Sequence, residues 1–448
     1  MPNMRRFVST LARLALAASS LSFTPLCEAE AAPALPQDCR VGFYRLQDGT
    51  GIDVGNTSSA SLRWRRADGT SGALHGEPGK ELTSTLGWTD RADGHRISFG
   101  DCAQGKIVVD GVTGRRVQFS IRESQFQNAG ATLAGRLILP SGSRRVPIVV
   151  LVHGSEDSSA LRYFALQRQF PAEGIGAFVY DKRGTGKSTG TFTHNYYQLA
   201  SDAAAAVREA RRLAGDRAGK TGMHGSSQGG WVAPLAADLT PVDFVVVAYG
   251  LAISPFDEDN EVVALDMTRH GFGAPEIAKA LEVARAAQDV ALSYFQYGYE
   301  ALDAVRAKYA GEPWLPYLRG NITQVVLTQP REWLRTEGPK FFAGGMPYYD
   351  PMPVLRRLDV PQLWILGADD IDAPVGETVR RLTRLKHDGR PIELVVYPRA
   401  EHGLYEYEVD AAGARQSLRQ PATYLPLMCD FIRAGRIGRK YGDSTIYR

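Results

Sequence analysis

Short apolar runs alternate with helical patterns along most of the chain. The runs are nearly continuous, which is typical of strands buried on both faces of a parallel sheet. They are LAGRLILP, VPIVVLVHG, GIGAFVYD, GKTGMHG, VDFVVVAYG, VPQLWILG and RPIELVVYP. Between the third and fourth runs, YYQLASDAAAAVREARRLAG has apolar positions at helical spacing and ends at Gly215. This βαβ order predicts an α/β fold with a mostly parallel sheet over residues 131–448.

One long segment, from about residue 251 to 358, interrupts this alternation. It has helical periodicity, is rich in Tyr and Phe, and is too long for a structureless loop. An insertion after the carboxyl end of a strand lies where ligands bind in open α/β sheets. The segment therefore predicts a helical cap, whose aromatic side chains are more typical of a core than of substrate contacts.

Residues 38–126 differ in character from the rest. They are rich in Gly, Asp, Thr and Arg, with short apolar alternations such as KIVVDG and RRVQFSI. Short strands between turn residues are expected, so this region is predicted to be a small β-rich accessory domain. His75 and His95 are isolated among turn residues and carry no catalytic spacing.

The first 31 residues have the order of a secretory signal. Arg5 and Arg6 precede the apolar run LARLALAASSLSF, and a small-residue stretch, AEAAPA, follows. The run is interrupted by Arg13 and is too short to span a bilayer, so no stable membrane anchor is expected after cleavage. A lipoprotein site at Cys27 is an alternative, although a leucine precedes it where such signals have a small residue. The expected location is periplasmic or secreted.

Cysteine usage agrees with export. Cys39 and Cys102 both lie in the β-rich region, where an oxidising compartment would allow them to close a disulfide. Cys429 lies in the apolar stretch YLPLMCDFI without a basic neighbour, which indicates a buried free thiol.

Composition and charge exclude some partners. Hydrophobic residues make up 44% of the chain, and 52 Lys and Arg are interspersed with 49 Asp and Glu. No basic stripe is evident, so no nucleic-acid partner is expected. The stretch DKRGTGKS is similar to a phosphate-binding loop, but Asp181 stands where that loop requires its first glycine. A carboxylate there would repel phosphate, and no nucleotide is expected.

The chemistry is indicated by G-x-S-x-G, which spans Gly225 to Gly229 and centres on Ser227. The motif follows a predicted strand and precedes the helical run GGWVAPLAADL, as a nucleophile in a strand-to-helix turn requires. A serine needs a general base, and the base needs an acid. His402 follows one later strand, in VVYPRAEHGLY, and the aspartates of LWILGADDIDAP follow the strand before it. Ser, Asp and His in this order are the α/β-hydrolase order.

From about residue 133 to its end, the chain resembles α/β-hydrolases of the group that includes dienelactone hydrolases, serine aminopeptidases and cap-bearing esterases. The resemblance rests on VVLVHGS, VYDKRGTGKSTG, GSSQGGW, GADDIDAP and AEHG. In such families the acid loop resembles G-x-x-D-x-x-x-P. This pattern implies Asp370 as the acid, with Asp369 and Asp372 open as alternatives.

The same resemblance implies an oxyanion hole formed by the backbone N–H groups of Gln228 and Ser155. It also implies that His153 is a structural member of its turn, and that Asp181 and Arg183 pin their loop through hydrogen bonds. This chain has two carboxylates, Glu156 and Asp157, where related enzymes often have glycine and proline. These are interpreted as solvated, with a subsite for a cationic substrate as the alternative.

Two further histidines, His194 and His224, also lie near the expected site. They have no metal-binding spacing around them, and neither a metal nor a cofactor is expected.

The prediction is a secreted serine hydrolase of the carboxylesterase type (EC 3.1.1) that cleaves a carboxylic ester through a Ser227–His402–Asp370 triad and an acyl-enzyme. The expected partner is a small-molecule ester or a short peptide. A serine peptidase of the aminopeptidase or Xaa-Pro type is an alternative, because the same triad serves both reactions. A non-catalytic binding protein on a hydrolase scaffold is the third hypothesis.

Overall fold

The computed structural model describes residues 38–58, 61–77, 79–345 and 348–448. The expected signal segment, residues 1–31, lies outside these described residues. Within them, no helix combines the length and apolar character that crossing a membrane requires.

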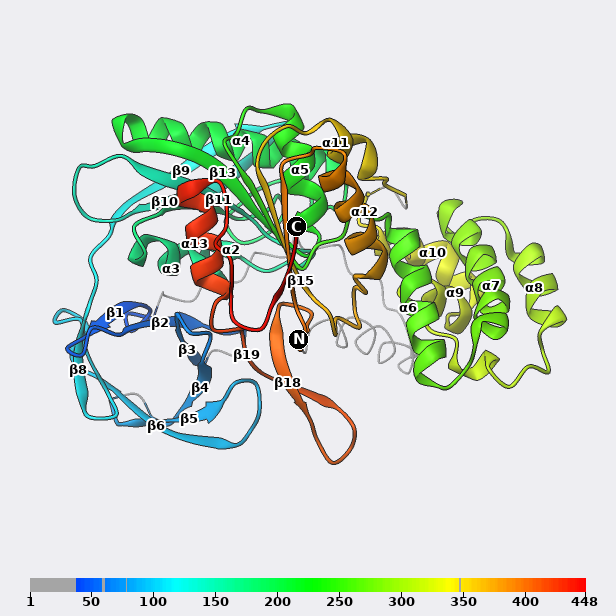
Figure 1. Cartoon of the computed structure of the whole chain (residues 1–448), viewed down its shortest axis with the longest axis horizontal. Coiled ribbons are helices and arrows are strands. Elements are labelled where there is room, and N and C mark those ends of the chain that lie inside the picture. The colour runs from blue at the N-terminus through cyan, green and yellow to red at the C-terminus, as the bar shows by residue number, and fades with distance from the viewer. Residues whose placement is uncertain (1–37, 59–60, 78, 346–347) are drawn as a thin grey trace, which may run out of the picture. The chain divides into compact units, whose positions relative to one another are not determined.

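Eight antiparallel strands form a closed barrel in which β1 pairs with β8 (Figure 1). Asp48-Gly49-Thr50 and Asp68-Gly69-Thr70 supply two of its hairpin turns, with glycine at a positive φ as such turns require. Alternate side chains such as Ile52, Val54 and Trp64 fill the interior. The strands are β1 (Gly42–Leu46), β2 (Gly51–Asn56), β3 (Leu62–Arg66), β4 (Ser71–His75), β5 (Leu82–Leu86), β6 (Ala92–Phe99), β7 (Lys106–Val109) and β8 (Val112–Arg116).

The barrel ends at Arg116, earlier than the accessory-domain boundary expected near residue 126. The next strand, β9 (Ser120–Asn128), pairs along its whole length with β10 (Ala131–Leu139) and belongs to the large sheet. Its Phe126 ring packs 5.9 Å from the ring of Phe178, which lies in that sheet. Only Ala129 and Gly130, both at positive φ, separate β9 from β10, so the two strands form a tight hairpin that belongs to the large sheet as a unit.

The large sheet has nine strands in the order β20-β16-β15-β14-β13-β11-β12-β10-β9. The six from β16 to β12 are parallel, whereas β9, β10 and β20 pair antiparallel. The mostly parallel α/β-hydrolase sheet is therefore confirmed. Its remaining strands are β11 (Val146–Val152), β12 (Gly176–Tyr180), β13 (Ala218–Ser226), β14 (Val245–Ala248), β15 (Gln362–Gly367), β16 (Ile392–Tyr397) and β20 (Thr445–Tyr447).

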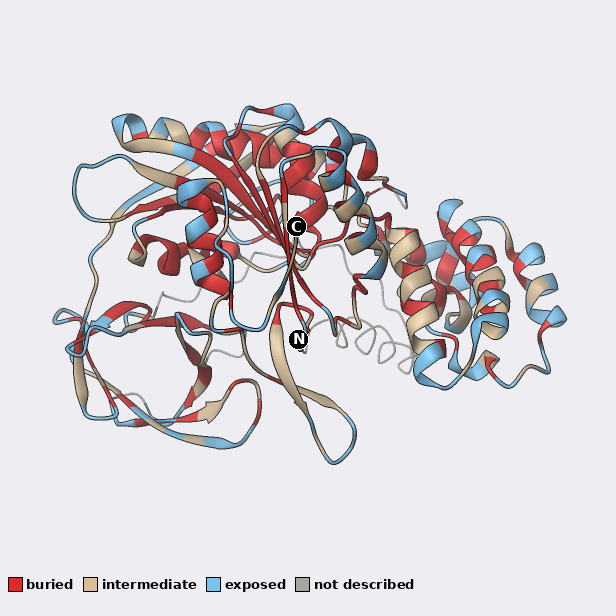
Figure 2. Cartoon of the chain, in the orientation of Figure 1, coloured by how far each residue is buried: buried red, intermediate tan, exposed pale blue. Residues whose placement is uncertain are grey.

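Helices cover both faces of this sheet (Figure 1), and Figure 2 shows its central strands buried. Side chains of β11 alternate between two cores, with Ile148 and Val150 in one and Val149 and Leu151 in the other. The first core is completed by α4 (Tyr196–Ala214), α5 (Gly229–Leu239), α11 (Met352–Arg357) and α12 (Gly376–His387). The second is completed by α2 (Ala160–Tyr163), α3 (Leu166–Ala172) and α13 (Tyr424–Ala434). Burial on both faces explains why the strands are apolar almost throughout.

A helical insertion leaves the sheet after β14 and returns before β15, and it has a core of its own. Its first helix begins with a capping box, in which Ser254 accepts from the Asp257 N–H and Pro255 occupies the first turn. Its helices are α6 (Pro255–Arg269), α7 (Ala274–Leu292), α8 (Tyr299–Lys308), α9 (Thr323–Thr328) and α10 (Arg331–Phe341). Val354 and Leu355 of α11 pack in the core of the large sheet, so the insertion core ends before that helix.

A small antiparallel sheet follows β16. It consists of β17 (Ala400–Glu401), β18 (Tyr405–Val409) and β19 (Arg415–Arg419). We call residues 400–420 the His402 hairpin, because His402 lies in the turn between β17 and β18. The position of this hairpin therefore sets the position of His402.

The described cysteines differ in state. Cys39 and Cys102 are both disulfide-bonded, whereas Cys429 is a free thiol. Burial raises the pKa of Cys429 to about 12, so that this thiol is unreactive near neutral pH.

Candidate active site

Ser227 lies in the sharp turn between β13 and α5, with its backbone in the left-handed region at φ 51°. This conformation costs a non-glycine residue roughly 1–3 kcal/mol. Close packing requires the flanking glycines, because a Cβ on Gly225 would lie 2.0 Å from the carbonyl oxygen of Gly229. A Cβ on Gly229 would lie 2.4 Å from the carbonyl oxygen of Val152. The G-x-S-x-G spacing thus meets the steric demands of this turn.

The structure brings Ser227, His402 and Asp370 together from loops that follow three different strands. Ser227 Oγ lies 3.0 Å from His402 Nε2, and His402 Nδ1 lies 2.8 Å from Asp370 Oδ2. In the neutral imidazole, Nδ1–H donates to Asp370 and Nε2 accepts from the serine hydroxyl. His402 is 9% exposed and Asp370 is 3% exposed. The arrangement can pass the serine proton to the imidazole.

The three aspartates of the acid loop have different partners. Asp370 Oδ1 accepts from the backbone N–H groups of Asp372 and Ala373, at 3.1 and 2.8 Å. Asp369 Oδ2 instead accepts from the Tyr407 hydroxyl at 2.9 Å. Of the three, Asp370 is the one whose carboxylate meets His402.

The charges around His402 favour its protonated form. Burial lowers the pKa of His402, but the attraction of Asp370 and the hydrogen bond with it outweigh this effect. The carboxylates of Asp372 and Glu258 add to the attraction, and the pKa of His402 rises to about 9.

Of the two expected oxyanion donors, Gln228 directly follows the nucleophile and Ser155 follows Gly154, on which a Cβ would lie 3.2 Å from Ser227 Cβ. Gln228 precedes α5, so its N–H lies at the positive end of a helix. In the described part of the chain, no backbone hydrogen bond uses the N–H of Ser155 or Gln228. The strand-end loop that carries Ser155 is held by Lys182, whose Nζ donates to the Gly154 carbonyl at 2.6 Å. His153 is buried in the same turn and its Nε2 lies 3.1 Å from a backbone carbonyl of β12.

Glu156 and Asp157 are both exposed beside this loop. Glu156 Oε1 accepts from the Gly154 N–H at 3.2 Å. Burial lowers the pKa of Lys182 to about 8, and attraction to Glu156 and Asp157 opposes that shift. Glu156 is therefore engaged within its own loop.

The DKRGTGKS stretch forms a loop whose backbone binds the buried carboxylate of Asp181. Asp181 is fully buried and accepts from Ser159 Oγ at 2.7 Å and from the Lys187 N–H at 2.9 Å. Arg183 Nε and Nη2 donate to the two carboxylate oxygens of Asp202, both at 2.7 Å. These bonds fix the loop beside the site through paired charges.

The two further histidines have different environments. Gln228 Nε2 donates to His194 Nδ1 at 2.9 Å. The backbone N–H of His194 donates to the Ala343 carbonyl, in the segment that returns from the insertion. Burial lowers the pKa of His194 to about 4, so this ring is neutral at pH 7. His224 is buried near Phe170, and its ring nitrogens have no hydrogen-bond partner among the described residues.

One carboxylate near the site, Glu258, is not identified by the sequence analysis. It lies in the first turn of α6, within electrostatic reach of His402 and Asp370. Burial raises the pKa of Glu258 to about 8, with His402 opposing the shift and Asp370 adding to it. In the sequence it is an ordinary acidic residue after a helix cap, and only the folding of the insertion brings it to His402.

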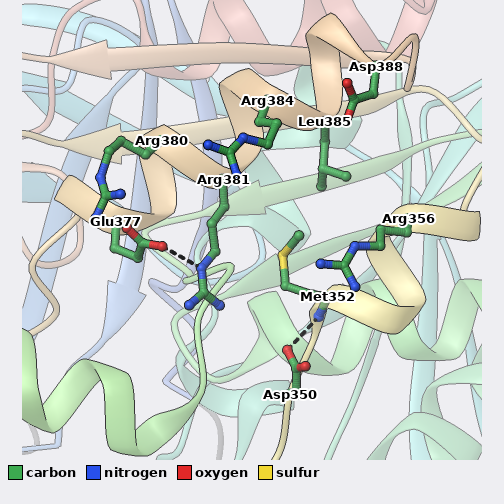
Figure 3. Close-up of a pocket in the computed structure, with 9 residues that line it drawn as sticks. All are labelled: Asp350, Met352, Arg356, Glu377, Arg380, Arg381, Arg384, Leu385 and Asp388. Atoms are coloured by element: carbon green, nitrogen blue, oxygen red, sulfur yellow. Dashed lines mark hydrogen bonds and ion pairs between the residues drawn. The ribbon is translucent and has the colours of Figure 1, made fainter.

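No group of three or more described His, Cys, Asp or Glu side chains is arranged to hold a metal. A cavity of about 310 Å³ lies between α11 and α12 and is lined by residues of both helices, of the segment before α11 and of the end of α12. Figure 3 shows these side chains. The charges in this cavity are partly paired, for example Arg381 with Glu377 at 2.7 Å. None of the residues around Ser227 lines it. The lining residues are Asp350, Met352, Arg356, Glu377, Arg380, Arg381, Arg384, Leu385 and Asp388.

Comparison with known proteins gives a family match for part of the chain. Residues 143–292 match the family described as serine aminopeptidase, S33. No curated protein matches the chain.

Solved structures of similar fold include peptidases and esterases. The acylaminoacyl peptidase of Pyrococcus horikoshii is 12% identical, with a TM-score of 0.44, over 87% of this chain and 57% of that chain. The chain thus spans only part of that peptidase. The esterase Pf2001 of Pyrococcus furiosus is 18% identical, with a TM-score of 0.40, over 63% of this chain and 84% of that chain. Est1E of Butyrivibrio proteoclasticus, solved with ferulic acid, is 16% identical, with a TM-score of 0.39, over 69% of this chain and 96% of that chain.

Proposed function

We propose that this chain, which belongs to the α/β-hydrolase superfamily of serine hydrolases, cleaves a carboxylic ester through an acyl-enzyme on Ser227. The observation that carries the proposal is the continuous hydrogen-bonded line from Ser227 Oγ through His402 to Asp370, at 3.0 and 2.8 Å. Such a line makes a serine hydroxyl nucleophilic, because the imidazole removes its proton as the oxygen attacks.

In the first half of the reaction, Ser227 Oγ bonds to the ester carbonyl carbon while its proton moves to His402 Nε2. Asp370 keeps the imidazole in the required tautomer and stabilises the imidazolium. The N–H groups of Gln228 and Ser155 donate to the oxyanion of the tetrahedral intermediate. The intermediate collapses, His402 returns the proton to the departing alcohol, and the acyl group remains on Ser227.

In the second half, a water molecule takes the place of the alcohol. His402 removes a proton from the water, and the hydroxide oxygen attacks the acyl carbon. The second tetrahedral intermediate collapses, the carboxylic acid leaves, and the proton on Nε2 returns to Ser227. The enzyme is then restored to its starting state.

A neutral ester suits the described surroundings of the nucleophile. Aromatic rings lie against both nearby histidines, with Tyr249 at 5.2 Å from His402 and Phe192 at 5.0 Å from His194. With a pKa of about 8, Glu258 is largely protonated at pH 7 and presents no fixed charge to a substrate.

Turnover of a short acyl ester should therefore exceed turnover of an aminoacyl amide at pH 7. Measuring kcat/KM of the wild-type protein with both substrates tests this expectation. Faster cleavage of the aminoacyl amide would overturn the ester assignment while leaving the triad assignment in place.

Faster cleavage of the aminoacyl amide would favour an aminopeptidase. The position of Glu258 near His402 is the observation that supports this alternative. A free amino terminus bound beside Glu258 would ionise the carboxyl group and form an ion pair with it. Glu258→Gln would then reduce cleavage of the aminoacyl amide by far more than cleavage of a neutral ester.

Glu258 also gives a prediction for pH dependence. Only the neutral form of His402 acts as a base, so kcat/KM should rise with pH up to about 9. Glu258, with its lower pKa of about 8, is ionised where His402 titrates and favours the imidazolium. Glu258→Gln should therefore move the rising limb of the ester pH profile to lower pH.

The matched control is Glu261→Gln, one turn further along α6, since Glu261 is not among the groups that shift His402. An unchanged limb in Glu258→Gln, or an equal shift in both variants, would contradict the predicted coupling.

We also propose export of the mature protein to the periplasm or beyond. The signal-like amino terminus and the disulfide-bonded state of Cys39 and Cys102 support this. Sequencing the amino terminus of the protein recovered from periplasm and medium checks it, and an intact amino terminus retained in the cytoplasm would argue against it.

A further inference from the structure

The His402 hairpin contacts the β-barrel at several points. The Trp88 N–H donates to the Ser417 carbonyl at 2.9 Å, and the Gln420 N–H donates to the Gly69 carbonyl at 3.2 Å. A third contact is an ion pair, in which Arg91 Nη2 lies 2.8 Å from a carboxylate oxygen of Glu408. These contacts involve β18, β19 and the residue that follows β19.

Aromatic packing reinforces the same contact. The Trp88 ring lies 4.2 Å from the Tyr405 ring, centroid to centroid, and the Arg63 guanidinium covers Trp88 at 4.2 Å. Tilted aromatic pairs and cation–π contacts both add attraction beyond the burial of their area. Tyr405 pairs with Glu401 across the turn that carries His402. Trp88 therefore supports the base of that turn.

A short chain of hydrogen bonds leads from the barrel to the residue after His402. Gln420 donates through its backbone to Gly69 and through its side chain, Nε2, to the Gly403 carbonyl at 3.1 Å. On its other side, the hairpin holds the acid loop, because Tyr407 donates to Asp369. The hairpin thus joins the barrel to both the His402 turn and the loop of Asp370.

We propose that the barrel is a positioning element of the active site: through Gly69 and Trp88 it holds the His402 hairpin so that the imidazole stays in line with Ser227. The inference rests on the proposed function, since it assigns a task in that reaction. Gly69 and Trp88 touch neither substrate nor reacting atoms, so they are positioning residues. Misplacing a catalytic group by about 1 Å can cost on the order of 10²-fold in rate.

The chain contains a matched pair of turns for testing this. Asp48-Gly49-Thr50 and Asp68-Gly69-Thr70 have the same sequence, and their glycines have φ values of 86° and 84°. In each, the threonine N–H donates to the aspartate, at 2.8 and 3.0 Å. A Cβ on Gly69 would lie 1.9 Å from the Gln420 carbonyl oxygen, whereas one on Gly49 would meet nothing within 4 Å. Alanine strains both backbones equally but displaces the hairpin at Gly69 alone.

The experiment compares Gly69→Ala and Gly49→Ala in the full chain. We expect Gly69→Ala to lower kcat for ester by about 10- to 100-fold with KM little changed, and to speed amide hydrogen exchange across residues 400–420. We expect Gly49→Ala to match the wild type in both measurements. Unchanged kcat and exchange in Gly69→Ala, or equal changes in both variants, would overturn the proposal.

A second pair of variants covers the case in which Gly69→Ala does not fold. Trp88→Ala should lower kcat and speed exchange across 400–420, and Trp88→Phe, which keeps a ring against Tyr405, should restore most of both. Equal behaviour of the two variants would overturn the proposal. Hydrogen exchange reports docking even without turnover. A wild-type protein inactive on esters would therefore sink the proposed function separately from the docking.

Discussion

Ser227→Ala is expected to reduce ester turnover by at least about 10⁴-fold while leaving the fold intact. The hydroxyl is the atom that forms the acyl-enzyme, and alanine offers no nucleophile in its place. Its Cβ is the one already present, so the strained turn at φ 51° accepts the substitution without a new clash. Steady-state kinetics, with thermal unfolding as a check on folding, measures the effect.

The matched control is Ser226→Ala, one residue earlier in the same motif. Ser226 ends β13 and its hydroxyl lies near that of Tyr249, whereas Ser227 is the serine that meets His402 Nε2. Loss of the Ser226 hydroxyl removes a single polar contact, worth about 1 kcal/mol, and most of the turnover should remain. Wild-type rates in folded Ser227→Ala, or abolition of turnover by Ser226→Ala alone, would contradict the assignment.

Asp370→Asn is expected to lower kcat by on the order of 10⁴-fold, the size of effect produced when an orienting carboxylate becomes an amide. The amide can donate a hydrogen bond to His402 Nδ1, which favours the wrong tautomer and leaves Nε2 protonated. It also cannot stabilise the imidazolium by charge. Comparing kcat of the variant and the wild type on one ester measures the loss.

The neighbouring aspartates serve as controls in the same loop. Asp369→Asn keeps an oxygen that accepts from Tyr407, and Asp372→Asn removes only a charge that acts on His402 from a distance. Each should lower kcat by less than about tenfold, the change that 1.4 kcal/mol produces. A larger loss in either one than in Asp370→Asn would move the acid to that residue.

Sequence reasoning singles out the proposed nucleophile and its proposed base because local rules govern both positions. The glycines around Ser227 are dictated by close contacts within a few residues and to the adjacent strand, so the motif carries its own steric reason. His402 and the aspartates follow buried strands, and the carboxyl ends of parallel strands meet at one edge of the sheet. Choosing among Asp369, Asp370 and Asp372 required a family resemblance. All three lie in a four-residue span after the same strand, so no local pattern tells which carboxylate meets the histidine.

Long-range contacts explain what the sequence does not reveal. Glu258 reaches His402 only through the packing of the insertion. The dockings of Gly69 and Trp88 onto the His402 hairpin join residues more than 300 positions apart in the printed sequence. No periodicity or motif encodes such pairs.

Whether Ser227 is an activated nucleophile is tested by labelling the folded protein with a fluorophosphonate and locating the modified residue by mass spectrometry. A serine reacts with this reagent when a neighbouring base activates it. We predict a single modification, on Ser227. Absence of labelling in folded protein would mean that the triad does not function and would favour a binding protein on a hydrolase scaffold, and labelling of another serine would place the nucleophile elsewhere.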